Sequence, residues 1–114
     1  MVSDDCIFCR IIKGELPAQF VYKDEKVVVI RDINPQAPTH LLVIPREHVP
    51  SADKVEDPSL WSQVMGVATK VAKDLGLVED GYRVVLNCGD RAGQTIYHLH
   101  VHVLSGRFFR WPPG

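Results

Sequence analysis

The chain has 114 residues, of which 46% are hydrophobic and 24% are charged, and its formal net charge is −1. This length and balance predict a single soluble globular domain that spans residues 1–114. The near-neutral charge gives no attraction to nucleic acid or to an anionic membrane, so any recognition of phosphate has to be local. No apolar run reaches the length of a membrane span, and the N-terminus lacks the features of a signal peptide. A cytoplasmic protein with no nucleic-acid or membrane partner is therefore the default expectation.

The N-terminal half predicts one short helix and three strands. Apolar residues within segment 6–13 recur at helical spacing, and Gly14 closes this helix. The two prolines of segment 32–38 cannot continue a sheet ladder, so this segment is a loop expected to bring Asp32 and His40 near one edge of the sheet. The three strands are predicted at residues 20–22, 27–31 and 40–44.

The C-terminal half predicts one long helix and two further strands. Asp57 is the expected N-cap, Pro58 lies in the first turn, and Gly76 ends the helix. The buried stripe of this helix is predicted to be Leu60, Val64, Val67, Val71 and Leu75. The two strands are predicted at residues 82–86 and 97–104. The order of elements predicts an α+β fold, an antiparallel sheet with one long helix across a face.

The most informative segment is the last predicted strand, His98-Leu-His-Val-His-Val-Leu104, which holds three of the five histidines. The histidines recur every second residue, which is the period of an extended strand. Their imidazoles are therefore expected to share one face, with neighbours about 6.6 Å apart. In one interpretation a His-x-His pair chelates a catalytic metal. In the other, one imidazole is a nucleophile and its neighbours bind and orient an anion.

A second group of possible ligands is the Cys6-x-x-Cys9 pair near the N-terminus. The chain has three cysteines, an odd number that does not suggest a disulfide framework. A closed, structural zinc site needs two more ligands, for which His48 and His98 are the candidates. The alternative is a pair of buried thiols with a solvated His48. Cys88 is best explained as a small apolar residue.

The histidine segment matches the His-φ-His-φ-His-φ-φ motif of the histidine triad (HIT) superfamily, where φ is apolar. The chain also resembles the nucleotide-binding (Hint) branch almost end to end: segment 32–40 is similar to its ribose loop, segment 93–97 to its phosphate loop, and the Trp-Pro-Pro-Gly end to its C-terminus. This resemblance implies a HIT-like fold with a five-stranded antiparallel sheet, one long helix and a short N-terminal helix.

The resemblance implies a purine nucleoside phosphoramidate hydrolase, acting on AMP-lysine, AMP-NH2 and related adenylate conjugates through a nucleotidyl-histidine intermediate. His100 is then the nucleophile, and His40 lies behind it and helps to orient it. Phosphate contacts are assigned to His102, Asn87, Gly93, Gln94 and Thr95. The family's enzymes commonly carry serine where Thr95 stands, so protonation of the leaving group is expected to be slower or sterically altered.

The resemblance also implies the remaining ligands and partners. Asp32 is expected to accept hydrogen bonds from the ribose, although a turn-forming role explains it equally well. The base slot is assigned to Ile7, Phe8, Ile11, Ile30 and Ile33, which composition alone would place in the core. The family forms homodimers in which the tail, here with Trp111, reaches the partner's active site. Structural zinc is assigned to Cys6, Cys9, His48 and His98, and no catalytic metal is required.

Three other functions compete with this one. Thr95 is compatible with a nucleotide-binding or scaffolding protein that has weak or vestigial catalysis. A metallohydrolase would use His98 and His100 as ligands. A dinucleoside polyphosphate hydrolase shares the triad, but the short chain and the Trp-Pro-Pro-Gly tail favour the phosphoramidate hydrolase.

Overall fold

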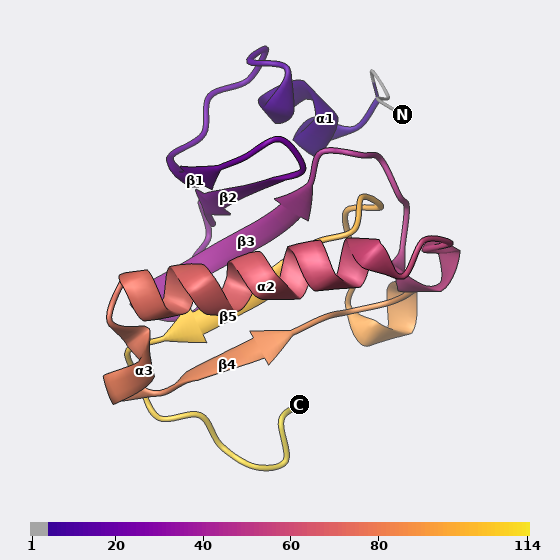
Figure 1. The fold of residues 1–114 in the computed structure, drawn as a ribbon. Coiled ribbons are helices and arrows are strands. Elements are labelled where there is room, and N and C mark those ends of the chain that lie inside the picture. The colour runs from indigo at the N-terminus through magenta and orange to yellow at the C-terminus, as the bar shows by residue number, and fades with distance from the viewer. Residues whose placement is uncertain (1–4) are drawn as a thin grey trace.

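The computed structural model describes residues 5–114 and has an α+β architecture (Figure 1). Five antiparallel strands form one sheet in the order β1-β2-β3-β5-β4. The elements are α1 (Ile7–Ile12), β1 (Phe20–Lys23), β2 (Val27–Arg31), β3 (Thr39–Pro45), α2 (Ser59–Asp74), α3 (Leu77–Asp80), β4 (Tyr82–Val85) and β5 (Val101–Ser105), with short 3-10 turns at Ala52–Lys54 and Asp90–Ala92. The predicted fold class is confirmed. Within the described range no helix is long and apolar enough to cross a membrane.

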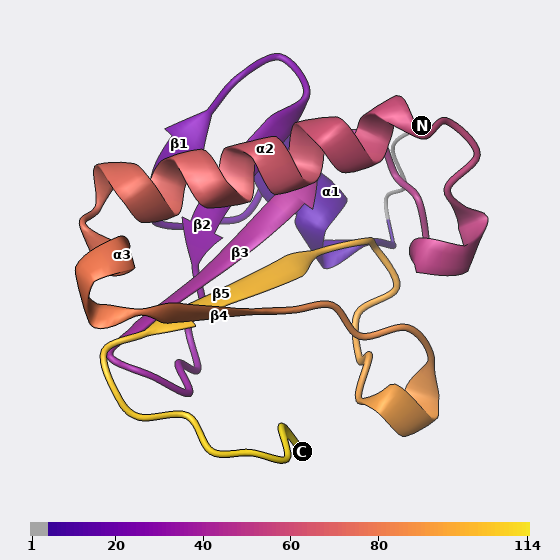
Figure 2. The same cartoon turned by 60° about the horizontal axis from the view of Figure 1, so that its bottom comes forward.

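Strands β2 and β3 are apolar at almost every position because both faces of the sheet are covered. Val29 and Val43 belong to the core under α2, the helix that crosses β3 and β5 in Figures 1 and 2. Their neighbours Val28 and Ile44 belong to a second core cluster, which includes α1. Since successive side chains of a strand point to opposite faces, α1 and α2 lie on opposite sides of the sheet.

Helix α2 begins one residue after the predicted start and ends at the predicted signal. The Asp57 carboxylate accepts the backbone N–H of Ser59 at 2.9 Å, but the N-cap position is Pro58, one residue after the predicted Asp57. Gly76 has φ +75°, a left-handed conformation that ends the helix and leads into α3. Leu75 was predicted in the buried stripe, but it is 41% exposed because the helix has already ended at Asp74. The short helix α3 was not predicted.

The histidine segment is only partly a strand. Regular pairing begins at Val101, opposite Val43 of β3, so His98 and His100 precede the ladder. His98 nevertheless lies on the same side of the sheet as the other two imidazoles, because the Phe8 ring packs against both His98 and His100, whereas the intervening Leu99 belongs to the core under α2. Within the strand, Val101 and Val103 face α2, so His102 between them faces the α1 side of the sheet.

Candidate functional site

Most of the side chains that the sequence singled out gather in two adjoining places on the α1 side. One is a cluster of two cysteines and two histidines. The other is a cavity of about 670 Å³ whose lining includes His40, His100 and His102. The loop that connects these places runs through His98 and His100, which lie two residues apart.

The first cluster brings four ligand atoms together. The Cys6 Sγ lies 3.2 Å from the His98 Nδ1, and the Cys9 Sγ lies 3.4 Å from the His48 Nδ1. The two histidine Nδ1 atoms are 3.2 Å apart. Ligands of one tetrahedral zinc ion are separated by about 3.3–3.8 Å, given zinc–ligand bonds of about 2.0–2.3 Å. The predicted zinc ligands therefore form a fitting set, and zinc bound there would fasten α1 to the loop after β3 and to the histidine segment.

Local structure explains why these four atoms converge. Cys6 is the N-cap of α1, and its sulfur accepts the Cys9 amide at 3.3 Å, which places both thiols at the same helix end. The His98 Nε2–H donates to the Pro45 carbonyl at 2.7 Å, so the Nδ1 lone pair is left for a metal. Burial raises the pKa of the Cys6 thiol. Zinc would bind the thiolates, so its binding releases protons.

This geometry is incompatible with the competing metallohydrolase. That function needs His98 and His100 to share a metal. Both nitrogens of His98 already have partners: the Nδ1 lies in the Cys-His cluster, and the Nε2–H donates to the Pro45 carbonyl. The His98 side chain is completely buried, so it cannot present either nitrogen to the cavity.

The nucleophile candidate, His100, lies between the cluster and the cavity. Its Nδ1 is 2.8 Å from the His98 carbonyl oxygen. Because that oxygen can only accept, the Nδ1 carries the proton, and the Nε2 of the neutral ring keeps its lone pair. The Phe8 ring packs edge-on against His100, with 5.2 Å between ring centroids. The ring is thus oriented from two sides, and no hydrogen bond joins its basic nitrogen to any residue in the described range 5–114.

A second hydrogen-bonded chain fixes the tautomers of His40 and His102. The backbone N–H of Gln36 donates to the His40 Nδ1 at 3.0 Å, so the proton of a neutral His40 is on Nε2. That Nε2 lies 2.9 Å from the His102 Nδ1 and donates to it. His102 is left with its proton on Nε2, which makes it a hydrogen-bond donor. The ring centroids of His100 and His102 are 5.0 Å apart, so an acceptor nitrogen and a donor nitrogen are neighbours at the cavity.

Burial keeps these rings neutral. It lowers the pKa of His102 to about 4, with smaller contributions from His100 and His40. It also lowers the pKa of His40, although the Asp32 carboxylate acts in the opposite direction. Neutral imidazoles are what both the nucleophile and the donor chain require.

We expect these shifts to make the free energy of unfolding fall in mild acid. Unfolded histidine titrates near 6.5, whereas folded His102 titrates near 4. Between these values the unfolded chain binds more protons, so stability is full above pH 6.5 and declines as the pH falls toward 4. Urea unfolding at several pH values measures the slope. Acid also releases zinc, so the wild type is compared with His102→Asn, which retains the zinc ligands; an equal slope in the two proteins would contradict the assignment.

The other wall of the cavity carries the predicted base-slot and ribose residues. The apolar members are all at the lining, namely Ile7, Phe8, Ile11, Ile30 and Ile33. Asp32 lines it too, and its Oδ1 accepts the Asn34 amide at 2.8 Å, so the turn-forming explanation also holds. Its Oδ2 lies 3.4 Å from the His40 Nε2.

The predicted phosphate loop is arranged differently from the expectation. The amides of Gly93 and Gln94 already donate to the carbonyls of Asp90 and Gly89. The Gln94 side chain is buried and bonds to Gly89, Pro50 and Ile96, so it shapes the loop rather than lining the cavity.

Three further predicted residues occupy different positions. Thr95 lines the cavity together with Gly93, whereas Asn87 is half-buried outside its lining. Trp111 is 82% exposed and is not among the lining residues of this single chain.

Sequence reasoning missed several contributors to the cavity. The most consequential is Gln36, because its backbone amide sets the tautomer of His40. Side-chain patterns in a sequence do not indicate which backbone N–H groups make a site. Only the position of Gln36 in the predicted ribose loop could have drawn attention to it. The other lining residues that were missed are Leu16, Pro17, Ala18, Arg31, Asn34, Leu42 and Ile96.

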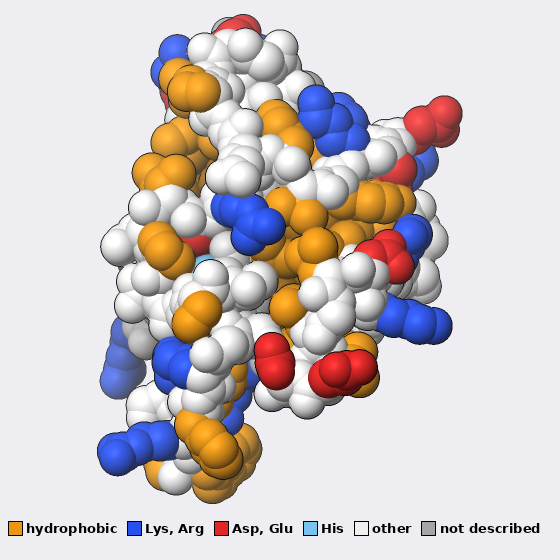
Figure 3. Space-filling model, turned by 90° about the vertical axis from the view of Figure 1, so that its left-hand side faces the viewer, with side chains coloured by type: hydrophobic (Ala, Val, Ile, Leu, Met, Phe, Trp, Pro, Cys, Tyr) orange, Lys and Arg blue, Asp and Glu red, His pale blue; other side chains and the backbone are white. Residues whose placement is uncertain are grey.

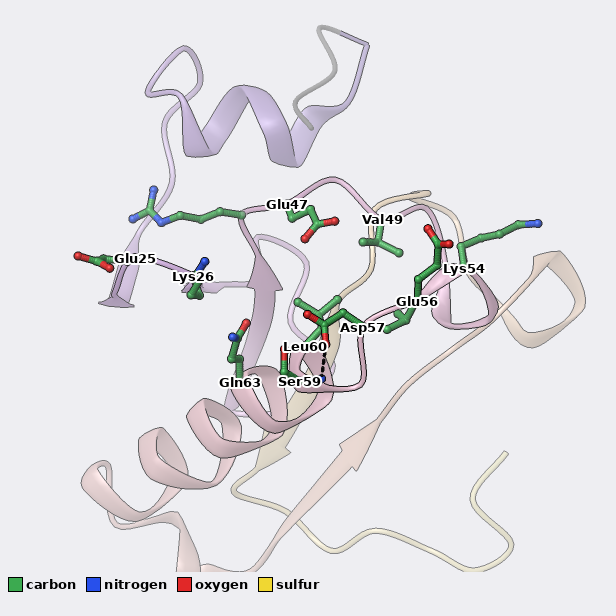
Figure 4. Close-up of a pocket in the computed structure, with 12 residues that line it drawn as sticks. Glu25, Lys26, Glu47, Val49, Lys54, Glu56, Asp57, Ser59, Leu60 and Gln63 are labelled. Carbon is green, nitrogen blue, oxygen red and sulfur yellow. Dashed lines mark hydrogen bonds between the residues drawn. The ribbon is translucent and has the colours of Figure 1, made fainter.

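A separate cavity of about 490 Å³ lies at the start of α2 (Figure 4). Charged side chains of both signs line it, among them Lys26, Glu47 and Glu56. At the nearby helix N-terminus the Asp57 carboxylate accepts the backbone N–H of Ser59. None of the predicted site residues lines this cavity, and we assign no function to it.

Known proteins share these features. A model of the HIT domain matches residues 13–109. The chain is 51% identical over 112 residues to a 14 kDa zinc-binding protein of Zea mays, with 95% of this chain and 87% of the relative covered. The solved structure of a HIT family hydrolase from Legionella pneumophila matches with a TM-score of 0.92 at 46% identity, covering 96% of this chain and 99% of that one. The solved structure of a histidine triad nucleotide-binding protein from Candida albicans matches with a TM-score of 0.82 at 34% identity, covering 96% of this chain and 84% of that one. With the fold, the histidine motif and most of its length matched, this chain belongs to the HIT domain family.

Proposed function

We propose that this protein hydrolyses the P–N bond of purine nucleoside 5′-phosphoramidates through a covalent nucleotide adduct on His100. The observation that carries the proposal is the pair of fixed tautomers at the cavity. His100 has a free Nε2 lone pair because its Nδ1–H is held by the His98 carbonyl. His102 has an Nε2–H donor because its Nδ1 accepts from His40. A nucleophile thus lies beside a donor suited to a phosphoryl oxygen.

The reaction balances with these groups. The His100 Nε2 attacks the α-phosphorus, the P–N bond to the leaving amine breaks, and the amine nitrogen gains a proton. We assign that protonation to the Thr95 hydroxyl, which lines the cavity. Water then cleaves the phosphorus–His100 bond, AMP leaves, and the proton released by water restores the hydroxyl. A neutral imidazole adds no negative charge as it attacks, so donors such as His102 can stabilise the phosphoryl oxygens.

The nucleotide part of the substrate fits the rest of the cavity. Ile30, Phe8 and Ile11 form an apolar wall suited to a flat purine ring. Asp32 offers a carboxylate to the ribose hydroxyls at the same lining. The Candida relative is named as a nucleotide-binding protein, which supports a nucleotide as the ligand. The Legionella relative is named as a hydrolase, which supports catalysis rather than binding alone.

The decisive experiment is to trap the adduct. Adenosine 5′-phosphoramidate is mixed with the protein, the reaction is stopped in cold base, in which phosphoimidazoles persist, and the digest is analysed by mass spectrometry. We expect AMP on the peptide that contains His100. Tight AMP binding without an adduct or turnover would favour a scaffolding role. Preferential cleavage of diadenosine polyphosphate would favour the dinucleotide hydrolase.

We further propose that the active unit is a homodimer to which the tail contributes. The base of the tail is fixed, because Phe109 packs under the guanidinium groups of Arg83 and Arg107. The aromatic side chains on either side of Phe109 are unpacked: Phe108 is 97% exposed and Trp111 82%. Large hydrophobic side chains gather at the lower end of Figure 3, where the tail lies in Figure 1. Exposed aromatic groups of this kind suit a second chain as partner.

We expect sedimentation velocity to give the mass of two chains at micromolar concentration. Trp111→Ala is expected to raise KM more than it lowers kcat, since the indole would contact bound substrate without reaching the phosphorus. Phe8→Leu, at the wall of the chain's own cavity, is the reference variant. A monomer with full activity would contradict the proposal.

We also propose a cytoplasmic location. The Cys6–Cys9 cluster can hold zinc only while both sulfurs are reduced, and the described cysteines are free thiols. Reducing compartments keep such thiols available.

A further inference from the structure

The proton on the His40 Nε2 has two possible hydrogen-bond acceptors, the His102 Nδ1 and the Asp32 Oδ2. The His40 Nδ1 is occupied by the Gln36 amide, so the ring's only proton is on Nε2. That nitrogen lies 2.9 Å from the His102 Nδ1 and 3.4 Å from the Asp32 Oδ2. The His40 side chain is 4% exposed, so water does not supply an alternative partner. Asp32 and His102 therefore compete for a single hydrogen bond.

These three side chains also have the composition of a two-histidine, one-carboxylate metal site, and their ligand atoms lie within 4.8 Å of one another. The Gln36 amide argues against a metal there. A metal on the His40 Nε2 would place the ring proton on Nδ1, where it would face the amide N–H. Two donors would then point at each other in a buried place, which is unfavourable. These three side chains are therefore better described as a hydrogen-bonded group that shares the His40 proton than as a metal site.

Asp32 faces both this proton and the cavity. Its Oδ1 is held by the Asn34 amide, while its Oδ2 is the atom nearest to His40. In the proposed reaction the same carboxylate accepts hydrogen bonds from the ribose hydroxyls. A ribose hydroxyl that donates to Oδ2 satisfies this oxygen and removes the competitor of His102. The His40 proton then belongs to His102 alone, and the donor Nε2–H of His102 is held in one orientation toward the phosphate.

We propose that Asp32 is a positioning residue that couples ribose recognition to the phosphate-binding His102 through His40. This inference rests on the proposed function and adds a feature to it. Ribose hydroxyls then accelerate the chemical step as well as strengthening binding. A substrate without them leaves the Asp32 carboxylate free to draw the His40 proton away from His102.

The kinetic test compares adenosine 5′-phosphoramidate with its 2′,3′-dideoxy analogue. In the wild type we expect the analogue to lose about fivefold in kcat, the size of one neutral hydrogen bond, in addition to its higher KM. In Asp32→Asn the amide oxygen can still accept from Asn34, but the NH2 group cannot compete for the His40 proton. We expect the two substrates to have the same kcat in this variant. Asp74→Asn, which removes an exposed carboxylate on α2, is expected to retain the wild-type difference.

A second measurement needs no turnover. The proton on the buried His40 Nε2 is followed by NMR in histidine-labelled protein, through its chemical shift and its coupling to the His102 Nδ1. Adenosine is expected to move both toward a stronger His40–His102 bond, and 2′,3′-dideoxyadenosine is expected to move neither. Equal kcat ratios in wild type and Asp32→Asn, or the same response to both nucleosides, would overturn the coupling. A wild type that binds adenosine but hydrolyses neither substrate would overturn the proposed function, while the NMR measurement would still decide the coupling.

Discussion

Replacing His100 with alanine is expected to abolish turnover of adenosine 5′-phosphoramidate, lowering kcat by about a thousandfold or more. The variant loses the nitrogen that we propose attacks phosphorus. Neither of the other two imidazoles that line the cavity can take its place: the His102 Nδ1 accepts from the His40 Nε2–H and the His102 Nε2 carries a proton, while the His40 Nδ1 accepts from the backbone N–H of Gln36. Single-turnover kinetics with excess enzyme measures the loss without interference from product release.

The same variant should keep its fold and its ligands. The His100 ring is half-buried at the cavity and contributes to neither of the two core clusters, so zinc content and the affinity for AMP are expected to stay near those of the wild type. His102→Ala is the informative comparison, because it removes a donor to the phosphate and should slow the reaction while the adduct still forms on His100. Substantial turnover by His100→Ala would refute the nucleophile assignment.

Much of the fold could be predicted because single side chains decide it. Asp57 and Gly76 mark the ends of α2 by local chemistry that needs no tertiary context. The alternating apolar residues of β5 place Val101 and Val103 on the α2 side and His102 on the other. Leu75 was misassigned because helical spacing continues past the point where the helix ends. Periodicity identifies a face, but it does not identify where the element stops.

The site was less predictable, because its chemistry depends on backbone atoms. The three histidines of the motif look equivalent in sequence, yet each has a different acceptor or donor: the Pro45 carbonyl for His98, the His98 carbonyl for His100, and His40 for His102. Carbonyls and amides have no residue-specific signal, so their positions follow only from the folded chain. The same holds for Gln94. Its side-chain amide suggests a ligand contact, but it is hydrogen-bonded to the backbone of Gly89 and Pro50.

Removing one zinc ligand is expected to cost the protein both its metal and much of its stability. Cys9 is 1% exposed and lies between the His48 and His98 nitrogens. Cys9→Ser retains the size of the side chain but removes the thiolate. We expect zinc content to fall from about one ion per chain to near zero, and the free energy of unfolding to drop by about 3 kcal/mol or more. For a domain of this size that corresponds to a fall in Tm of about 10 °C or more.

Cys88→Ser provides the matched control, because Cys88 is the exposed cysteine and lies outside the cluster. It should retain one zinc ion and the wild-type Tm, measured by a colorimetric zinc assay and by thermal unfolding followed by circular dichroism. His100→Ala should also retain zinc. If Cys9→Ser lost the metal with no change in Tm, zinc would not be what holds α1 to the sheet, and contacts such as those of Phe8 and Ile11 would be sufficient. If His100→Ala lost the metal, the separation between structural and catalytic histidines two residues apart would fail.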